Sequence, residues 1–307
     1  MAAATRADDG AVLAAIGARA RSGPAPATDQ SRPGEPFPGA ADTEPSRTLA
    51  VEDVRELASA LGVPAKRVEC IALRSRIIPE RYSRNLASFS PEDQASLLES
   101  SVTVVGAGGL GGWLAEILAR SGVGMLRLID GDTFDGTNLN RQLFSEETTL
   151  GRTKVEVAAE RLLRVNSSVD VEPHAAYLTA ENGERLVAGS VAVADCLDSI
   201  HARYVLQDAA AASGVPLVSA AVGGTSGQLL TILPGDAGLR SLYGDRDGVP
   251  DRGEEVLLGN LPFTVAAVAS LQAAEIVRIL LGKPPLHRNR LLLVDLSAAS
   301  FEQVSLG

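Results

Sequence analysis

Cysteine and histidine are too scarce in this sequence to build a disulfide or metal framework. The 307 residues contain only Cys70 and Cys196, and three histidines at positions 174, 201 and 287. The cysteines form no Cys-x-x-Cys pair, and the histidines have no metal-ligand spacing. These absences exclude a disulfide-rich secreted domain and lead us to predict that the chain holds no zinc.

Basic residues and long apolar runs are also lacking. The chain has 28 Lys and Arg residues against 38 Asp and Glu residues, so its formal net charge is -10. A surface of this sign does not favour non-specific binding of nucleic acid. No apolar run reaches the roughly 18 residues of a membrane span, and the N-terminus has no signal-peptide core. We predict a cytoplasmic protein that binds neither nucleic acid nor membrane.

The composition divides the chain into three parts. Residues 1–49 are rich in Ala, Pro and Gly, which predicts a flexible or disordered segment with at most a marginal helix near Val12–Arg21. Residues 50–80 are predicted to form a small accessory region that contains a helix over Val51–Leu61. Residues 81–307 are predicted to form one large domain.

Strands and helices alternate within the large domain. Ser90 is expected to cap a first helix, and from Ser101 onward short apolar strands alternate with helical segments. This order is typical of an α/β fold, a Rossmann-like and mostly parallel sheet flanked by helices. The segment 234–255, rich in Gly and Asp, is expected to be a mobile loop over one face. The expected strands are 102–105, 125–129, 169–172, 191–194, 216–219, 290–296 and 301–304, and the expected helices end at Arg120 or cover 151–165, 200–212 and 264–281.

A glycine-rich loop joins the first strand of this domain to its helix. Gly106, Gly108 and Gly111 follow the pattern Gly-x-Gly-x-x-Gly, with Gly109 between them. Small residues let backbone N–H groups approach phosphate oxygens, and the helix N-terminus adds positive potential. Asp130, at the end of the next strand, is placed to accept hydrogen bonds from ribose hydroxyls. The pattern predicts a nucleotide site, which by itself fits a nicotinamide or flavin cofactor as well as ATP.

Charged and amide residues after the later strands favour ATP. The carboxyl ends of parallel strands gather on one edge of a sheet, so these residues are expected to converge on one crevice. Two cations and a carboxylate suited to Mg²⁺ match a triphosphate, which carries more charge than a dinucleotide. A nicotinamide-dependent oxidoreductase shares the glycine loop and Asp130 but would not need Arg141, Lys154 and Asp198. The residues expected in the crevice are Asp130, Asp132, Asn138, Arg141, Gln142, Lys154 and Asp198.

With these motifs in order, the sequence resembles the ThiF/MoeB/HesA adenylating enzymes, relatives of the ubiquitin-activating enzymes. The resemblance covers about Arg81 to Leu296. It rests on the glycine loop and on motifs that read Arg-Tyr-Ser-Arg-Asn from Arg81, Asp-Gly-Asp from Asp130, Asn-Leu-Asn-Arg-Gln from Asn138, and Asp-Cys-Leu-Asp ending at Asp198.

The resemblance implies a role for each residue in the set. The glycine loop would hold ATP, and Asp130 would hold its ribose. Asp198 would bind Mg²⁺, and Arg84 would reach the γ-phosphate from the second subunit of a homodimer. The phosphates would be surrounded by Asn138, Arg141, Gln142 and Lys154.

Each assignment has a plainer structural alternative. Arg84 could pair with Glu80 or Asp93 on the surface, and Lys154 could be a solvated lysine at a helix start. The same reasoning allows Arg141 to close a loop, Asp198 to cap the next helix, and Asp132 to be purely structural. A catalytically idle binding protein with the same fold is a further alternative.

Two departures from the family limit the chemistry. Residues 197–307 contain no cysteine, so that segment cannot carry the acyl group as a thioester. Cys196 lies between Asp195 and Leu197 in a motif with two aspartates, where nearby carboxylates disfavour a thiolate, and we predict a buried structural role for it. Ser199 stands where many relatives have Asn.

Two carboxylate substrates remain open within the family. One is a ubiquitin-like sulfur carrier that ends in Gly-Gly, and the other is a ribosomally made peptide, as for the microcin-type peptide-adenylating enzymes. The sequence before the glycine loop resembles the latter, and Val51–Glu80 could form a reduced peptide clamp or only an extension that stabilises a dimer. We favour the peptide at this point, with the mixed-charge segment 234–255 expected near the entrance for the acyl substrate.

Overall fold

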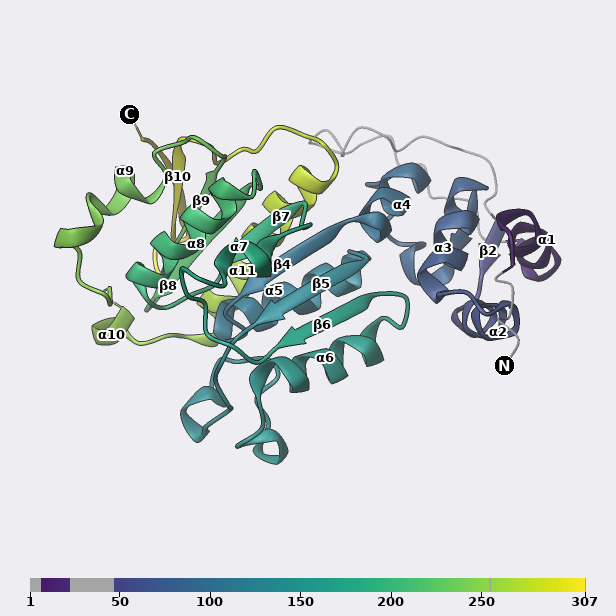
Figure 1. Ribbon diagram of the computed structural model, residues 1–307, viewed down its shortest axis with the longest axis horizontal. Helices are drawn as coiled ribbons and strands as arrows, with labels where there is room; N and C mark the ends of the chain where they lie inside the picture. The colour runs from purple at the N-terminus through teal and green to yellow at the C-terminus, as the bar shows by residue number, and fades with distance from the viewer. Residues whose placement is uncertain (1–6, 23–46, 254, 307) are drawn as a thin grey trace. The chain divides into compact units, whose positions relative to one another are not determined.

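The computed structural model describes residues 7–22, 47–253 and 255–306, and its chain divides into two compact units (Figure 1). The first unit runs to Glu99 and also includes residues 121–124 and 166–169. The second unit contains the remaining chain from Ser100 onward. Most of the segment that is predicted to be flexible, residues 1–6 and 23–46, lies outside the described residues.

The first unit combines helices with a three-stranded sheet in the order β1-β2-β3. Helix α1 belongs to its core, because Val12 and Ile16 are fully buried against residues of α2 and α3. The prediction of a flexible segment over 1–49 is therefore corrected for α1 and for β2, whose Leu49 joins the same apolar cluster. The elements are α1 (Asp9–Arg19), β1 (Arg21–Ser22), β2 (Arg47–Leu49), α2 (Val51–Leu61), α3 (Ala65–Arg74), β3 (Ile77–Pro79), η1 (Glu80–Tyr82) and α4 (Pro91–Glu99).

Local sequence signals set two helices of this unit. Helix α2 has the predicted bounds and ends at Gly62, which adopts the left-handed conformation that favours glycine. Helix α4 begins as expected after Ser90, whose hydroxyl accepts a hydrogen bond from the Asp93 amide at 3.0 Å. The Asp93 carboxylate accepts one from the Ser90 amide at 3.0 Å in return, which is a reciprocal cap.

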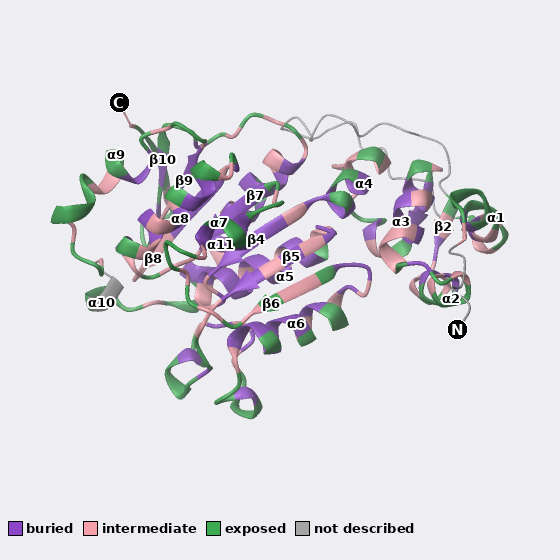
Figure 2. Ribbon diagram, in the orientation of Figure 1, coloured by how far each residue is buried: buried purple, intermediate pink, exposed green. Residues whose placement is uncertain are grey.

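The second unit is built on an eight-stranded sheet in the order β11-β10-β9-β8-β7-β4-β5-β6. Strands β4 to β8 pair in parallel, whereas β8 to β11 pair antiparallel at one end. The central strands β4 and β7 are almost wholly buried (Figure 2). The predicted Rossmann-like α/β fold is confirmed. The strands are β4 (Ser101–Val105), β5 (Met125–Ile129), β6 (Asp170–His174), β7 (Ala192–Asp195), β8 (Leu217–Gly223), β9 (Ser226–Ile232), β10 (Arg290–Asp295) and β11 (Ser300–Ser305).

Helices connect and cover these strands. The longest, α11, packs against β7, β8 and β9. It is the one helix among the described residues that is long and apolar enough to cross a membrane, which the sequence analysis did not anticipate, and more than half of that apolar stretch is buried inside the protein. The helices are α5 (Gly109–Ser121), α6 (Lys154–Val165), α7 (Gly183–Val187), α8 (Ile200–Ala212), α9 (Leu239–Tyr243), α10 (Glu255–Leu258) and α11 (Pro262–Leu280), with short 3-10 turns η2 (Gly136–Asn138), η3 (Glu147–Thr149) and η4 (Arg246–Gly248).

The segment 234–255, which was expected to be a mobile loop, contains α9 and η4 in its described part and is hydrogen-bonded to α8. Tyr204 of α8 donates its hydroxyl to the carbonyl of Gly244 at 2.7 Å, and Gln207 accepts a hydrogen bond from the Leu239 amide at 2.8 Å. Arg246 pairs with Asp208 at 2.5 Å. These contacts fold the segment into α9 and η4, because α8 offers polar partners along one face.

Candidate functional site

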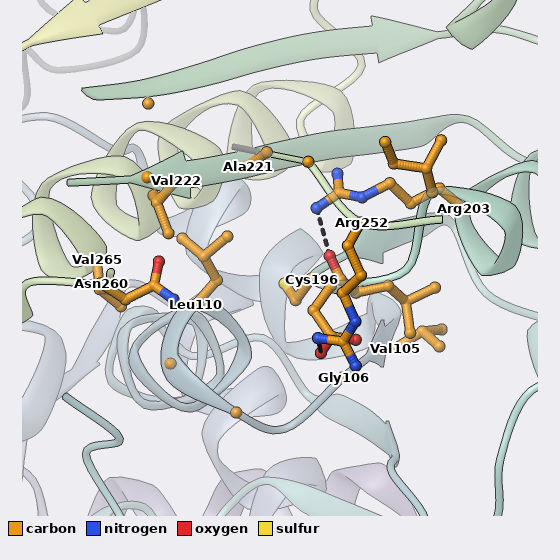
Figure 3. Close-up of a pocket in the computed structure, with 18 of the residues that line it drawn as sticks. Val105, Gly106, Leu110, Cys196, Arg203, Ala221, Val222, Arg252, Asn260 and Val265 are labelled. Carbon is orange, nitrogen blue, oxygen red and sulfur yellow. Dashed lines mark hydrogen bonds and ion pairs between the residues drawn. The ribbon is translucent and has the colours of Figure 1, made fainter. Parts of the chain in front are cut away.

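A cavity of about 820 Å³ opens at the carboxyl ends of the central strands (Figure 3). It lies where the two halves of a doubly wound sheet diverge, the usual position of a ligand site in such folds. An adjacent hollow of about 540 Å³ shares Asp132, Arg141 and Lys154 with it. Of the predicted site residues, ten line the cavity or the hollow: Gly106, Gly108, Gly109, Asp130, Asp132, Asn138, Arg141, Gln142, Lys154 and Asp198.

Close packing explains two glycines of the loop. Gly106 has a φ of 91° and its amide donates to the Ile129 carbonyl at 2.8 Å, and a Cβ there would lie 2.5 Å from the carbonyl oxygen of Cys196. A Cβ on Gly111 would lie 1.7 Å from the carbonyl oxygen of Gly106. Gly111 therefore serves the close packing of the turn on α5 and does not line the cavity. Gly109 begins α5, whose first-turn N–H groups have no partner within the helix.

Asp130 braces the glycine loop from the neighbouring strand. Its carboxylate accepts hydrogen bonds from the amide of Ala107 at 2.7 Å and from the amide of Asp132 at 2.8 Å. Burial raises the pKa of Asp130, and the positive charge of Lys154 opposes this shift. Each carboxylate oxygen has a second lone pair, so the two backbone contacts leave Asp130 able to accept a ligand hydroxyl.

Asp132 receives two side-chain donors at the mouth of the cavity. Lys154 Nζ lies 2.8 Å from one carboxylate oxygen, and the Tyr177 hydroxyl lies 2.7 Å from the other. Burial alone would raise the pKa of Asp132, but these two hydrogen bonds outweigh it and the pKa is lowered. Asp132 is therefore ionised at neutral pH and fixes the ammonium group of Lys154, which is itself buried. Lys154 is not the solvated lysine of the plainer alternative.

The Asn-Leu-Asn-Arg-Gln motif forms a tight turn beside the hollow. Asn138 is buried and its Oδ1 accepts from the Asp135 amide at 3.2 Å, so it helps to close the turn. Arg141 donates to the Thr137 carbonyl at 2.8 Å, as the loop-closing alternative requires, while it also lines the cavity. Gln142 is buried beside Gly108, and its Oε1 has no hydrogen-bond partner in the part of the chain that the structure describes. A ligand in the cavity could satisfy that atom.

Asp198 does not cap the helix that follows it. The cap of α8 is Ser199, whose hydroxyl accepts from the Ala202 amide at 3.1 Å. The Asp198 carboxylate instead pairs with Arg252 at 2.5 Å. Both side chains are largely exposed, at 67% for Asp198 and 57% for Arg252, so the carboxylate remains accessible from the cavity.

A buried ion pair forms the floor of the cavity. Arg203 of α8, which lines the cavity (Figure 3), contacts Asp195 at 3.1 Å and donates to the carbonyls of Ala220, at 2.9 Å, and Leu197. Cys196 lies beside this network and its thiol faces Gln272 at 3.4 Å. Burial and the charge of Asp195 raise the pKa of the Cys196 thiol, which keeps this thiol protonated.

Arg84 belongs to the first unit, whereas the cavity belongs to the second. Its side chain is exposed, and it makes no ion pair with Glu80 or Asp93 among the residues that the structure describes. The plainer alternative of a surface ion pair is not what the structure contains.

Three cavity residues were not identified from the sequence. Tyr177 follows the end of β6, so the rule that strand ends gather on one edge could have found it. Arg252 lies in the mixed-charge segment that the sequence analysis singled out without choosing a residue. Arg203 carried no signal, because an arginine within a helix is usually solvated.

No group of three or more metal-ligating side chains occurs within the residues that the structure places. Mg²⁺ does not require one, since it commonly keeps several waters and binds through one or two carboxylates together with substrate phosphates. Asp198, exposed on a cavity that is also lined by Arg141 and Lys154, fits that mode of binding.

Comparisons with known proteins agree with this geometry. The sequence model of the ThiF family matches residues 82–307. The SAMP-activating enzyme E1 of Haloferax volcanii is 37% identical over 230 residues, which cover 73% of this chain and 84% of that protein. The adenylyltransferase and sulfurtransferase MOCS3 of Bos taurus is 36% identical over 254 residues, 81% of this chain and 55% of that protein. The chain thus spans about half the length of that second relative.

The fold is shared with solved structures at lower identity. The E. coli enzyme MccB, solved with ATP, superimposes with a TM-score of 0.64 and 21% identity, over 83% of this chain and 82% of that chain. At this identity the likeness supports the fold alone.

Proposed function

This chain belongs to the ThiF family, and from that premise we propose that it uses ATP and Mg²⁺ to adenylate the C-terminal carboxylate of a protein or peptide. The observation that carries the proposal is the convergence on one cavity of a glycine loop at a helix N-terminus, the cations Arg141 and Lys154, and the exposed carboxylate of Asp198. This set neutralises a triphosphate and leaves space beside it for a second substrate.

The reaction needs positioning more than proton transfer. A substrate carboxylate, already ionised at neutral pH, attacks the α-phosphorus of ATP. The new bond joins carboxylate oxygen to phosphorus, the bond to the bridging oxygen breaks, and pyrophosphate leaves. Negative charge grows on phosphate oxygens, so Arg141 and Lys154 contribute by holding fixed positive charge there. Mg²⁺ bound at Asp198 would add further neutralisation of the leaving pyrophosphate.

Asp130 and the glycine loop would place the nucleotide for this attack. The loop is pinned to Asp130 through the Ala107 amide, so the N–H groups that start α5 are held in one orientation. Asp130 would then accept from a ribose hydroxyl, while Asn138 and Gln142 would line the phosphate end.

For the acyl substrate we favour a Gly-Gly-ended carrier over the ribosomal peptide that the sequence analysis preferred. Relatives with more than a third of residues identical are named as an activating enzyme and as an adenylyltransferase with sulfurtransferase activity. The end of β8 and the start of β9 line the cavity with Ala221, Gly223, Ser226 and Gly227. Such small side chains accept a tail of glycines at close range. A ribosomally made peptide remains the second candidate substrate.

Pyrophosphate exchange tests both levels of the proposal. The purified chain is incubated with Mg²⁺, ATP and labelled pyrophosphate, together with either a Gly-Gly-ended carrier or a candidate peptide from the same source. We expect exchange only with the carrier. Exchange that depends on the peptide would reverse the choice of substrate, and ATP binding without any exchange would favour an idle binding protein.

We also propose that the chain acts as a homodimer in which Arg84 completes the partner's site. The side chain is exposed, so it is accessible to a second copy of the chain. Mixing Arg84→Ala with Lys154→Ala chains tests this arrangement. Hybrid dimers contain one intact site only if Arg84 acts across the interface, so exchange should reappear on mixing. No recovery in a verified hybrid would contradict the proposal.

A further inference from the structure

The segment 249–252 is held against the N-terminus of α8 by hydrogen bonds. The carbonyl of Asp251 accepts from the Ile200 amide at 2.8 Å, and its carboxylate accepts from the Ser199 hydroxyl at 2.5 Å. The same carboxylate accepts from the His201 amide at 3.3 Å. These bonds fix the backbone next to Arg252, so its side chain is directed along the cavity (Figure 3).

Arg252 forms an ion pair with Asp198, the carboxylate that would bind Mg²⁺ in the proposed function. Its guanidinium lies 2.5 Å from Asp198, and both groups are more than half exposed. An ion pair with this exposure is weak, because water and salt screen it. A divalent cation held jointly by Asp198 and by phosphates would therefore displace the guanidinium.

The other cations around the cavity are held by different partners. Lys154 is buried against Asp132, and Arg203 is buried against Asp195. Arg141 donates to a backbone carbonyl beside the hollow. Arg252 differs from them because its ion pair with Asp198 is exposed and is made with the group that would bind the metal.

We propose that Arg252 receives the carboxylate of the acyl substrate, and that Asp198 holds it until Mg²⁺ and ATP bind. The inference rests on the proposed function of this site. A substrate carboxylate must approach a triphosphate, and two anions repel each other. A released guanidinium that lines the same cavity offsets that repulsion and binds a carboxylate through two parallel hydrogen bonds. Nucleotide therefore binds first, and the acyl substrate follows.

The test measures two affinities that this arrangement shifts in opposite directions. In Arg252→Gln, Asp198 has no competing cation, so calorimetry should show Mg·ATP binding about three- to tenfold tighter than in the wild type. The KM of the acyl substrate in pyrophosphate exchange should rise about ten- to a hundredfold, as expected for the loss of hydrogen bonds to a charged group. Arg252→Lys keeps the positive charge but loses the planar guanidinium, so both of its affinities should lie between those of the wild type and Arg252→Gln.

Arg240→Gln is the matched control. Arg240 belongs to the same segment, pairs with Asp245 at 2.9 Å and is similarly exposed, and it does not line the cavity. Neither affinity should change in this variant, and thermal unfolding of both variants verifies that they are folded.

The outcomes separate this inference from the function on which it rests. Weaker binding of both ligands in Arg252→Gln would indicate a structural role, and no change in either would show that Arg252 is a bystander, so both results overturn the inference. A wild-type chain that binds no Mg·ATP would instead overturn the proposed function, and this inference with it.

Discussion

Lys154 and Asp132 form an ion pair of 2.8 Å in which the lysine is buried and the aspartate is half exposed. This asymmetry means that the pair orients the lysine more than it stabilises the fold. Removal of the lysine leaves Asp132 open to water, and Asp130, whose charge the lysine also offsets, keeps its two backbone hydrogen bonds. Substitution of Lys154 should therefore lower activity with little change in stability.

Lys154→Ala is expected to lower pyrophosphate exchange by about a hundredfold or more, in the range found when a fixed charge-stabilising group is removed from an active site. The melting temperature should change by only a few degrees. Arg152→Ala is a suitable control, because Arg152 begins the same region and forms an exposed pair with Glu160. Exchange that survives in Lys154→Ala would exclude this residue from the chemistry.

Neighbouring glycines of α5 should respond differently to the same substitution. In Gly111→Ala the new methyl group would overlap the Gly106 carbonyl oxygen, so we expect a loss of about 3 kcal/mol in unfolding free energy. In Gly112→Ala it would meet Phe144 at 3.5 Å, an ordinary contact. Stability there should be unchanged or higher by up to about 1 kcal/mol, because alanine favours the helix. Urea unfolding of both variants measures the difference, and equal losses would contradict the geometry.

His287 should make the stability depend on pH near neutrality. Burial lowers the pKa of His287 below its ordinary value, although Glu275 acts in the opposite direction. The unfolded chain therefore takes up the proton at a higher pH than the folded chain does. Above the pKa of the unfolded chain, about 6.5, the neutral ring contributes its full share to stability. This contribution is lost as the pH falls from that value through the lower pKa of the folded chain.

His287→Gln should flatten this dependence. Unfolding free energies measured by urea titration at pH 7.5 and 5.5 should fall more steeply in the wild type than in the variant. The other histidines are common to both chains and cancel in the comparison. Parallel pH profiles would show that His287 does not carry the effect.

Neither cysteine should take part in acyl transfer. Burial raises the pKa of the Cys70 thiol to about 12 and also raises that of Cys196, so both are protonated at pH 8. We expect a thiol reagent to label the folded chain slowly and the unfolded chain rapidly. A folded Cys70→Ala/Cys196→Ala double variant should retain adenylate formation. Rapid labelling of the native chain, or a thioester that survives denaturation, would contradict this prediction.

Much of the second unit could be predicted from the sequence because its signals are local. Strand β5 and helix α8 have the predicted bounds, and the glycine loop lies between strand and helix as expected. Two of the differences from the prediction have a physical reason. Strand β9 mixes polar and apolar residues, and its pairing with β8 and β10 defines it. Helix α1 would be marginal alone and forms against the core of the first unit.

The candidate site shows the same division. The rule that strand ends gather on one edge was sufficient to predict that Asp130, Lys154 and Asp198 line one cavity. Asp130 and Asp198 follow parallel strands, and Lys154 begins the helix α6 that leads to the next strand. The partners of these residues were not predictable. Tyr177 and Arg252 reach the cavity through chain segments whose paths depend on distant contacts.

The sequence by itself determined the parallel α/β order, the glycine-rich turn between β4 and α5, and the identity of the charged groups, since these follow from residues close together in the chain. Only the tertiary structure decided which charged side chains form ion pairs with each other. Asp132 fixes Lys154, Arg252 covers Asp198, and Arg203 lies buried under the cavity with Asp195. Ion pairs of this kind join residues between 8 and 54 positions apart, and their formation depends on the packing that brings them into range.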